Sequence, residues 1–178
     1  MNSISISIID FEAHHQQWFE SFNRKWIEDY FVMEDIDEYV LRNPQEAILA
    51  PGGAILMAMY NGEPAGTVGL KKISDIAYEF TKMAVGDEYR RKGIGEALSY
   101  ASFKKAASMG AKEILLYSNT KNAAAILLYE KLGFHHLPVE KGVYARANVK
   151  MIISIEDALF AAGKYYEHTQ SHLKTNLP

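Results

Sequence analysis

Two glycines and three cationic residues lie together near the middle of the chain, directly after a strand-like segment at residues 78–85. Glycine lets the backbone approach a ligand closely, and the first N–H groups of a helix have no acceptor inside the helix. A helical pattern begins within this segment, so it is typical of a site where backbone N–H groups hold a pyrophosphate that nearby cations neutralise. The segment consists of Arg90, Arg91, Lys92, Gly93, Ile94, Gly95 and Glu96.

Three types of phosphate-binding loop combine glycine and cations in this way. A Walker A loop places four residues between its first glycine and Gly-Lys-Ser/Thr, and the chain has no such sequence. A Rossmann loop needs a third small residue where Leu98 stands, and an acidic residue after the next strand, where the chain has residues 118–120, Ser-Asn-Thr. The third type, Arg/Gln-x-x-Gly-x-Gly/Ala, is matched by Arg90, Gly93 and Gly95 without a mismatch.

Two further segments accompany this loop. A strand-like segment at residues 79–85 precedes it, and residues 122–134 follow with the form Asn-x-x-Ala-x-x-Leu-Tyr-x-x-x-Gly-Phe. In these motifs and in the order of its elements, the chain resembles the GNAT acyltransferase family across residues 4–155. Its N-terminal part and Pro-Gly-Gly at residues 51–53 are also similar to the acetyltransferase half of bacterial proteins that fuse a MarR-type regulator to a GNAT domain. At 178 residues the chain is too short to carry that regulator as well.

The resemblance implies acetyl-CoA as the cofactor and an amine as the acceptor. The loop amides would surround the pyrophosphate, and the central strand would splay from its neighbour after Val85 and pair with the pantetheine arm. The amide of Met83 or Ala84 would then polarise the thioester carbonyl. The expected cofactor-binding residues are Met83, Ala84, Val85, Arg90, Arg91, Lys92, Gly93, Ile94, Gly95, Glu96, Asn122, Ala125, Tyr129 and Lys131.

Two residues are expected to move protons. The resemblance makes Tyr129 the general acid beside the leaving sulfur, although its helical spacing also suits simple packing in a buried helix face. Glu79 lies on the central strand where many relatives place a base, and it could take a proton from the acceptor ammonium directly or through water. The alternative for Glu79 is a surface carboxylate or an ion pair with Lys82 or Lys71.

The acceptor pocket is expected from the first helices and the late strands. Aromatic residues there also suit a hydrophobic core, and Arg146 indicates an acceptor that carries a carboxylate. Adjacent residues of a strand point to opposite faces, so His135 and His136 predict no metal site. The expected acceptor-binding residues are Trp26, Tyr30, Phe31, Glu34, Tyr144 and Arg146.

Composition narrows the class of protein. The chain is 48% hydrophobic and 23% charged, with a net charge of -3, which argues against a general nucleic-acid-binding protein. It has no cysteine, which excludes disulfides, thiolate metal sites and a cysteine acyl carrier. The N-terminus lacks the pattern of a signal peptide, and no apolar run approaches the roughly 20 residues of a membrane helix. We therefore expect a cytoplasmic protein with one domain at residues 1–178.

Periodicity predicts strands at residues 4–8, 54–60, 64–70, 76–85, 114–117 and 149–155. It predicts helices at residues 14–30, 36–41, 93–109, 122–132 and 156 to about 173, the last within a C-terminal extension at residues 156–175. The fold class is α/β (α+β mixed), the GNAT fold, with a mostly antiparallel mixed sheet of about seven strands flanked by helices.

The predicted function is N-acetyltransfer from acetyl-CoA to a primary amine of a small molecule or peptide. Direct attack in a ternary complex fits a chain without cysteine. The alternative is a non-catalytic acyl-CoA-binding sensor on the same fold, which needs the glycine loop but neither Tyr129 nor a base. The expected partners exclude nucleic acid and membrane and include a second copy in a homodimer.

Overall fold

The computed structural model describes residues 5–140 and 144–175, and within them seven strands form one sheet in the order β1-β2-β3-β4-β5-β7-β6. Neighbouring strands are antiparallel except β4 and β5, which are parallel. The mostly antiparallel mixed sheet confirms the predicted fold class. The strands are β1 (Ile6–Asp10), β2 (Ala54–Tyr60), β3 (Glu63–Lys72), β4 (Ala77–Val85), β5 (Glu113–Ser118), β6 (His135–Leu137) and β7 (Val149–Ser154).

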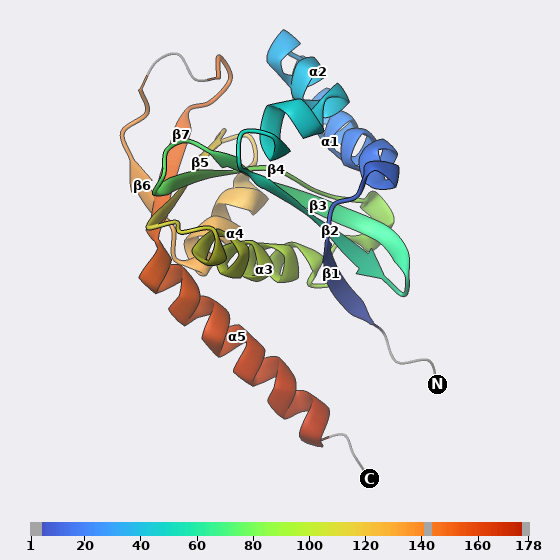
Figure 1. Ribbon diagram of the computed structural model, residues 1–178, viewed down its shortest axis with the longest axis vertical. Helices are drawn as coiled ribbons and strands as arrows, with labels where there is room; N and C mark the ends of the chain where they lie inside the picture. The colour runs from blue at the N-terminus through green and yellow to red at the C-terminus, as the bar shows by residue number, and fades with distance from the viewer. Residues whose placement is uncertain (1–4, 141–143, 176–178) are drawn as a thin grey trace.

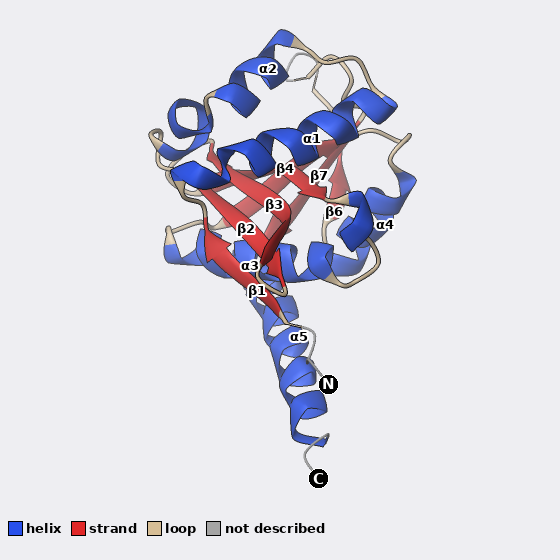
Figure 2. Cartoon of the chain, turned by 90° about the vertical axis from the view of Figure 1, so that its right-hand side faces the viewer, coloured by secondary structure: helices blue, strands red, loops and turns tan. Residues whose placement is uncertain are grey.

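Helices cover both faces of the sheet. In Figure 1, α1 and α2 lie on one face, α3 and α4 lie on the other, and α5 runs away from the sheet toward the C-terminus. Figure 2 shows the sheet between these two layers. The helices are α1 (Gln16–Tyr30), α2 (Asp35–Arg42), α3 (Ile94–Ser108), α4 (Ala123–Leu132) and α5 (Ile155–Thr175), with short helical turns η1 (Ala13–His15), η2 (Gln45–Leu49) and η3 (Asp87–Tyr89).

Each face of the sheet has its own hydrophobic core. Successive side chains of a strand point to opposite faces, so Ile55 packs with α1 and α2 while Leu56 packs on the side of α3. In β4 the same alternation sends Tyr78 and Phe80 to the α3 core, which leaves Glu79 on the α1 face. The fold thus places this carboxyl on the side of the sheet that α1 and α2 cover.

The predicted strands at residues 54–60, 64–70 and 76–85 are present as β2, β3 and β4, which form an antiparallel meander. β2, β3 and β4 follow one another with hairpin pairing. Asn61 and Gly62 form the first turn with φ of 52° and 88°, which are the left-handed angles that a two-residue hairpin requires. The strand predicted at residues 114–117 is present as β5, which pairs in parallel with β4.

Some elements differ from the sequence prediction. The first strand occupies Ile6–Asp10 rather than residues 4–8, and residue 4 lies outside the described residues. The edge strand β6 and the π-helical segment η2 were not predicted. β6 has three exposed residues and therefore lacks the alternation of apolar and polar residues that marks a half-buried strand.

The strands β4 and β5 separate earlier than expected. Their pairing covers only Ala77–Glu79 of β4, opposite Glu113–Leu115 of β5. The expected separation after Val85 is therefore wrong, because residues 80–85 have no partner on β5. On the other side of β4, the register with β3 shifts between Thr67 and Gly69, and Lys82 there has a left-handed φ of 50°. This bulge and the open edge lie next to each other along β4.

Candidate active site

A cavity of about 90 Å³ lies where β4 separates from β5. It brings together residues from α1, β4, the end of β5, the start and middle of α4, and the loop before β7. Among the residues that line it are Asn23, Trp26, Phe31, Glu79, Thr81, Lys82, Met83, Tyr117, Asn119, Asn122, Tyr129, Tyr144 and Arg146.

Glu79 lies in this cavity and is almost fully buried, with 2% of its surface exposed. Its Oε1 accepts a hydrogen bond of 2.8 Å from the Tyr144 hydroxyl. Burial raises the pKa of the Glu79 carboxyl, and the hydrogen bond from Tyr144 and the charges of Lys71 and Lys82 partly offset the rise. Neither ion pair that the sequence offered as an alternative is formed. Lys82 pairs with Asp37 instead, and Lys71 forms no ion pair with Glu79.

Tyr129 lines the same cavity from α4. Its ring packs edge-on against Phe80 and Phe134, at 5.9 and 6.0 Å between ring centroids. The residue is therefore part of the core as well as of the cavity wall. Burial raises the pKa of the phenol, so the hydroxyl keeps its proton at neutral pH. No described residue forms a hydrogen bond with this hydroxyl, which leaves its proton available to a ligand in the cavity.

A buried charge cluster borders the cavity. Asp37 of α2 is fully buried, and its oxygens lie 2.5 and 2.9 Å from the two Nη atoms of Arg146 and 2.9 Å from Lys82 Nζ. Burial alone would raise the pKa of Asp37, but hydrogen bonds and charge from Arg146 and Lys82 lower it to about 2. Glu34 Oε1 also lies 3.3 Å from Arg146. Arg146 is therefore not a free cation for an acceptor carboxylate.

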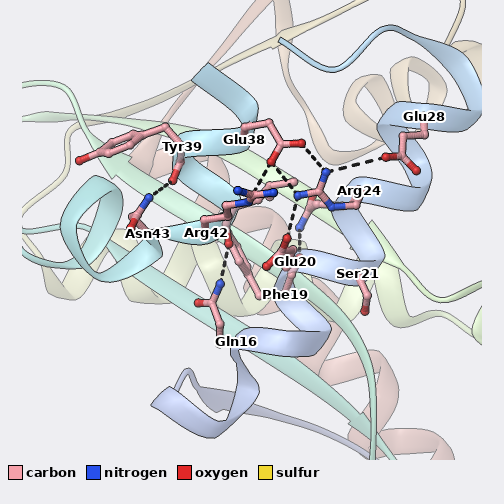
Figure 3. Close-up of polar contacts among 12 residues, drawn as sticks. Gln16, Phe19, Glu20, Ser21, Arg24, Glu28, Glu38, Tyr39, Arg42 and Asn43 are labelled. Atoms are coloured by element: carbon pink, nitrogen blue, oxygen red, sulfur yellow. Dashed lines mark hydrogen bonds and ion pairs between the residues drawn. The ribbon is translucent and has the colours of Figure 1, made fainter. Parts of the chain in front are cut away.

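A second polar network fixes α2 to α1, next to Asp37. Arg24 of α1 donates to both oxygens of Glu38, at 2.5 and 2.9 Å, and to Glu20 at 2.7 Å (Figure 3). Gln16 Nε2 donates to the carbonyl of Leu41 at 2.6 Å. These bonds join the two helices, so the position of Asp37 is set by the helix layer rather than by a loop.

The glycine loop has the backbone geometry that a phosphate site needs. Arg91 and Gly93 have left-handed φ angles of 60° and 79°, and α3 begins directly after Gly93. The first bond of the helix runs from the Ala97 amide to the Gly93 carbonyl at 3.0 Å. The amides of Ile94, Gly95 and Glu96 therefore lie at the helix N-terminus without a helical acceptor.

The cations around this loop differ in their partners. Arg90 pairs with Asp87 at 2.7 Å, and Lys131 pairs with Glu96. Lys92 Nζ lies 4.9 Å from the centre of the Tyr60 ring. The side chain of Arg91 is exposed and has no partner among the described residues. Arg91 and Lys92 can thus meet a phosphate without first leaving a carboxylate.

These features fit coenzyme A on three counts. The helix N-terminus at Gly93 and the adjacent cations suit a pyrophosphate. The edge of β4 at residues 80–85 faces no strand and can pair with an extended amide-bearing arm. Tyr129 lines the cavity between them.

The other predicted site residues fall into two groups. Trp26, Phe31, Asn122 and Met83 line the cavity. The remaining residues contribute elsewhere: Ala84 is buried in β4, Val85 and Ala125 pack against the α3 core, Glu34 pairs with Arg146, and Tyr30 is 48% exposed outside the cavity lining.

Several residues of the cavity, and Asp37 of the charge cluster that borders it, were not predicted from the sequence. Asp37 has the signal of an ordinary helix start, because its Oδ2 also accepts from the Glu34 amide at 3.2 Å in a capping box. The sequence predicted Lys82 only as an alternative ion-pair partner of Glu79. Asn23, Tyr117 and Asn119 carry no motif, and only the tertiary fold brings them to the cavity.

Within the described residues, no group of three or more His, Asp or Glu side chains is arranged to hold a metal ion. His135 and His136 are both exposed on β6. Over the same part of the chain, none of the helices combines the length and the apolar character needed to cross a bilayer.

The glycine loop, the open edge of β4 and the cavity are parts of one family pattern. The model of the acetyltransferase (GNAT) family matches residues 12–134. The chain belongs to this family. The sequence-based assignment to GNAT and the predicted class of enzyme, an acetyltransferase, are thereby confirmed.

Known proteins agree with the assignment. An N-alpha-acetyltransferase from Saccharolobus solfataricus is 48% identical over 128 residues, which cover 65% of this chain and 70% of the relative. An acetyltransferase of the GNAT family from Staphylococcus aureus Mu50 has a TM-score of 0.76 at 21% identity, covering 85% and 99% of the two chains. The PaiA N-acetyltransferase from Thermoplasma acidophilum, solved in complex with coenzyme A, has a TM-score of 0.67 at 21% identity, covering 84% and 99%.

Proposed function

We propose that this GNAT protein transfers an acetyl group from acetyl-CoA to a primary amine of a small molecule or peptide, by direct attack in a ternary complex. One observation carries the proposal. Glu79 and Tyr129 line the same cavity at the point where β4 leaves β5. When bound, acetyl-CoA supplies an acetyl group activated as a thioester. The coenzyme A complex of the Thermoplasma neighbour and the activity named for the Saccharolobus relative both support this donor and reaction class.

Glu79 is the proposed base. An alkylamine has a pKa near 10.4, so only about one part in a few thousand is unprotonated at pH 7. A buried carboxyl with a raised pKa is a stronger base at neutral pH than a solvated one. Glu79 can therefore take the surplus proton of the acceptor at its carboxyl, directly or through water.

Tyr129 is the proposed acid. Its raised pKa keeps the proton on the hydroxyl oxygen at neutral pH, and this hydroxyl has no competing acceptor among the described residues. The ring is held by Phe80 and Phe134, so little conformational entropy is lost when Tyr129 acts on a ligand in the cavity. These properties suit a donor that acts at one fixed position.

The backbone holds the donor in this proposal. The N–H groups of residues 94–96 and the side chains of Arg91 and Lys92 bind the diphosphate, and the open edge of β4 binds the arm. In the same proposal, the amide of Met83 or Ala84, beside the bulge at Lys82, would stabilise negative charge on the thioester carbonyl oxygen.

A panel assay tests the proposed function. The protein is mixed with acetyl-CoA and with simple amines, amino acids, polyamines and short peptides, and the release of the coenzyme A thiol is followed with a thiol-reactive dye. Turnover with at least one amine, and its loss in Glu79→Gln, is the expected result. Coenzyme A binding by calorimetry without turnover on any amine would favour the alternative function, a non-catalytic acyl-CoA sensor.

Further expectations from the sequence stay predictions. They are a single domain at residues 1–178 with the extension at residues 156–175, a cytoplasmic location, a homodimer, and the likeness to the acetyltransferase half of MarR–GNAT fusion proteins. Sedimentation velocity tests the homodimer directly, since one copy has a mass of 20.1 kDa.

A further inference from the structure

The described segment before β7, residues 144–148, is fixed to three other parts of the chain. Its residue Tyr144 donates to Glu79 of β4, and its residue Arg146 pairs with Asp37 of α2. Asn148, at the end of the loop, bonds to both the backbone and the side chain of Thr120, at 2.9 and 3.0 Å. Residues 144–148 are therefore held in a defined position, and Tyr144, Arg146 and Ala147 among them line the cavity.

Tyr144 lies between the base candidate and the charge cluster. Its hydroxyl is 2.8 Å from Glu79 Oε1, its ring packs edge-on against Tyr117 at 5.8 Å, and Lys82 Nζ lies 5.9 Å from its ring centre. Glu79 is almost fully buried, so water has little access to the carboxyl, and this hydroxyl fixes one of its oxygens.

We propose that Tyr144 is a positioning residue, which holds the Glu79 carboxyl in the acceptor cavity through its hydroxyl and is itself kept within reach by the ion pair between Arg146 and Asp37. This role presupposes the proposed function of Glu79 as the base. It adds a reason for the buried ion pair, which touches no reacting atom in that mechanism.

The ion pair is suited to hold a loop. Arg146 uses both Nη atoms on the two oxygens of Asp37, and this bidentate geometry fixes the guanidinium in direction as well as in distance. The Asn119 side chain also donates to the Arg146 carbonyl at 2.5 Å, so the backbone of the loop is held at the same residue. Tyr144 stands two residues away and shares this anchorage.

The polar and charged groups around Glu79 predict how its pKa changes when one of them is removed. Lys71 is its register partner on β3, Lys82 follows it on β4, and Tyr144 approaches from the loop. All three favour the ionised carboxyl, and the nearby Thr81 side chain acts in the same direction. Removal of the Tyr144 hydroxyl takes away the strongest of these influences, so the pKa of Glu79 should rise further.

A carboxyl titration by carbon-13 NMR in the cofactor-free protein tests this directly. The Glu79 signal is identified by its absence in Glu79→Gln. In Tyr144→Phe, which keeps the ring against Tyr117, we expect the Glu79 titration to move to higher pH. The matched control is Tyr39→Phe, which removes a hydroxyl that donates to Glu46 at 3.3 Å on the exposed surface of α2, and there the Glu79 titration should stay unchanged. A wild-type Glu79 titration in Tyr144→Phe would overturn the proposal.

The second half of the proposal, the anchoring ion pair, is tested by Arg146→Gln. We expect its Glu79 titration also to move to higher pH, and the double variant with Tyr144→Phe to show no further shift, because both changes break the same contact. If Arg146→Gln titrates like the wild type, the ion pair does not hold Tyr144. A thermal melt of each variant confirms that the comparison is made on folded protein.

Kinetics supply an independent readout. In Tyr144→Phe, kcat/KM at pH 7 should fall about tenfold to a hundredfold, because a misplaced catalytic group loses effective concentration, and the acidic limb of the pH profile should move up with the NMR titration. An unchanged acidic limb would contradict the positioning role. The NMR titration needs neither turnover nor coenzyme A, so a failure of the proposed enzyme and a failure of the positioning role give different results.

Discussion

The guanidinium of Arg146 lies on the carboxylate of Asp37, at 2.5 and 2.9 Å, although 109 residues separate them in the chain. This contact joins the helix layer over one face of the sheet to the loop that closes the cavity. It also leaves Arg146 already paired, although the sequence had suggested this cation as a partner for a carboxylate on the acceptor. The pocket therefore offers an amine acceptor a carboxyl at Glu79 but no free guanidinium.

Replacing Asp37 by Asn should destabilise the protein by about 3 kcal/mol or more, because Lys82 and Arg146 would lose the fully buried carboxylate that pairs with both. Chemical denaturation measures the change in the free energy of unfolding. Asp29→Asn breaks the exposed pair with Lys25 and serves as the control, with no measurable change in the free energy of unfolding expected. A wild-type stability for Asp37→Asn would show that the buried cluster contributes nothing to the fold.

The same carboxylate should make stability depend on pH. The pKa of Asp37 is about 2 in the folded protein against 3.8 for the free group, so its ionised form stabilises the fold fully above about pH 4. This contribution should be lost as the pH falls from about 4 to about 2. The free energies of unfolding of the wild type and of Asp37→Asn should therefore converge as the pH falls through this window. A constant difference between the two free energies would refute the assigned pKa.

Gly93→Val should weaken coenzyme A binding at least about tenfold, because a branched side chain at the helix N-terminus would crowd the diphosphate. Gly62→Val is a matched control, since Gly62 has a similar left-handed φ of 88° and, like Gly93, open space where a Cβ would stand. Both variants should lose about 1 to 2 kcal/mol of stability from the strained backbone. Calorimetry that finds equal affinities for coenzyme A in the two variants would remove the loop from the cofactor site.

Tyr129→Phe should lower kcat by about a hundredfold while the affinity for coenzyme A changes little, because only the donor proton is removed. Stability should not fall, since the hydroxyl has no hydrogen-bond partner among the described residues. Tyr165→Phe on α5, whose ring stacks on Tyr100 far from the cavity lining, is the control. Wild-type turnover in Tyr129→Phe would reduce Tyr129 to a packing residue.

The parts of the fold that the sequence predicted well have local signals. Asn61 and Gly62 mark a hairpin by their own backbone preferences, and Gly93 marks the start of α3 in the same way. Gly133 ends α4 with a left-handed φ of 101°. The glycine loop and the helix of Tyr129 could be predicted because the residues that mark each motif lie close together in the sequence.

The rest of the site depends on contacts that no local pattern records. Asp37 has its partners 45 and 109 residues away, so within its own helix it differs little from any acidic residue in a first turn. The separation of β4 from β5 begins after Glu79 because the pairing of two distant strands ends there. Tyr144 reaches Glu79 only because the loop before β7 folds back over the cavity.

The most direct test of the account is the rate of coenzyme A thiol release from acetyl-CoA in the presence of a primary amine acceptor, measured from pH 5 to pH 10 for the wild type and for Glu79→Gln. We predict turnover that rises with pH through the ionisation of Glu79 in the wild type, and a fall of about a hundredfold or more in Glu79→Gln with coenzyme A affinity retained. Equal rates and equal pH profiles in the two proteins would contradict the assignment of Glu79 as the base in this site.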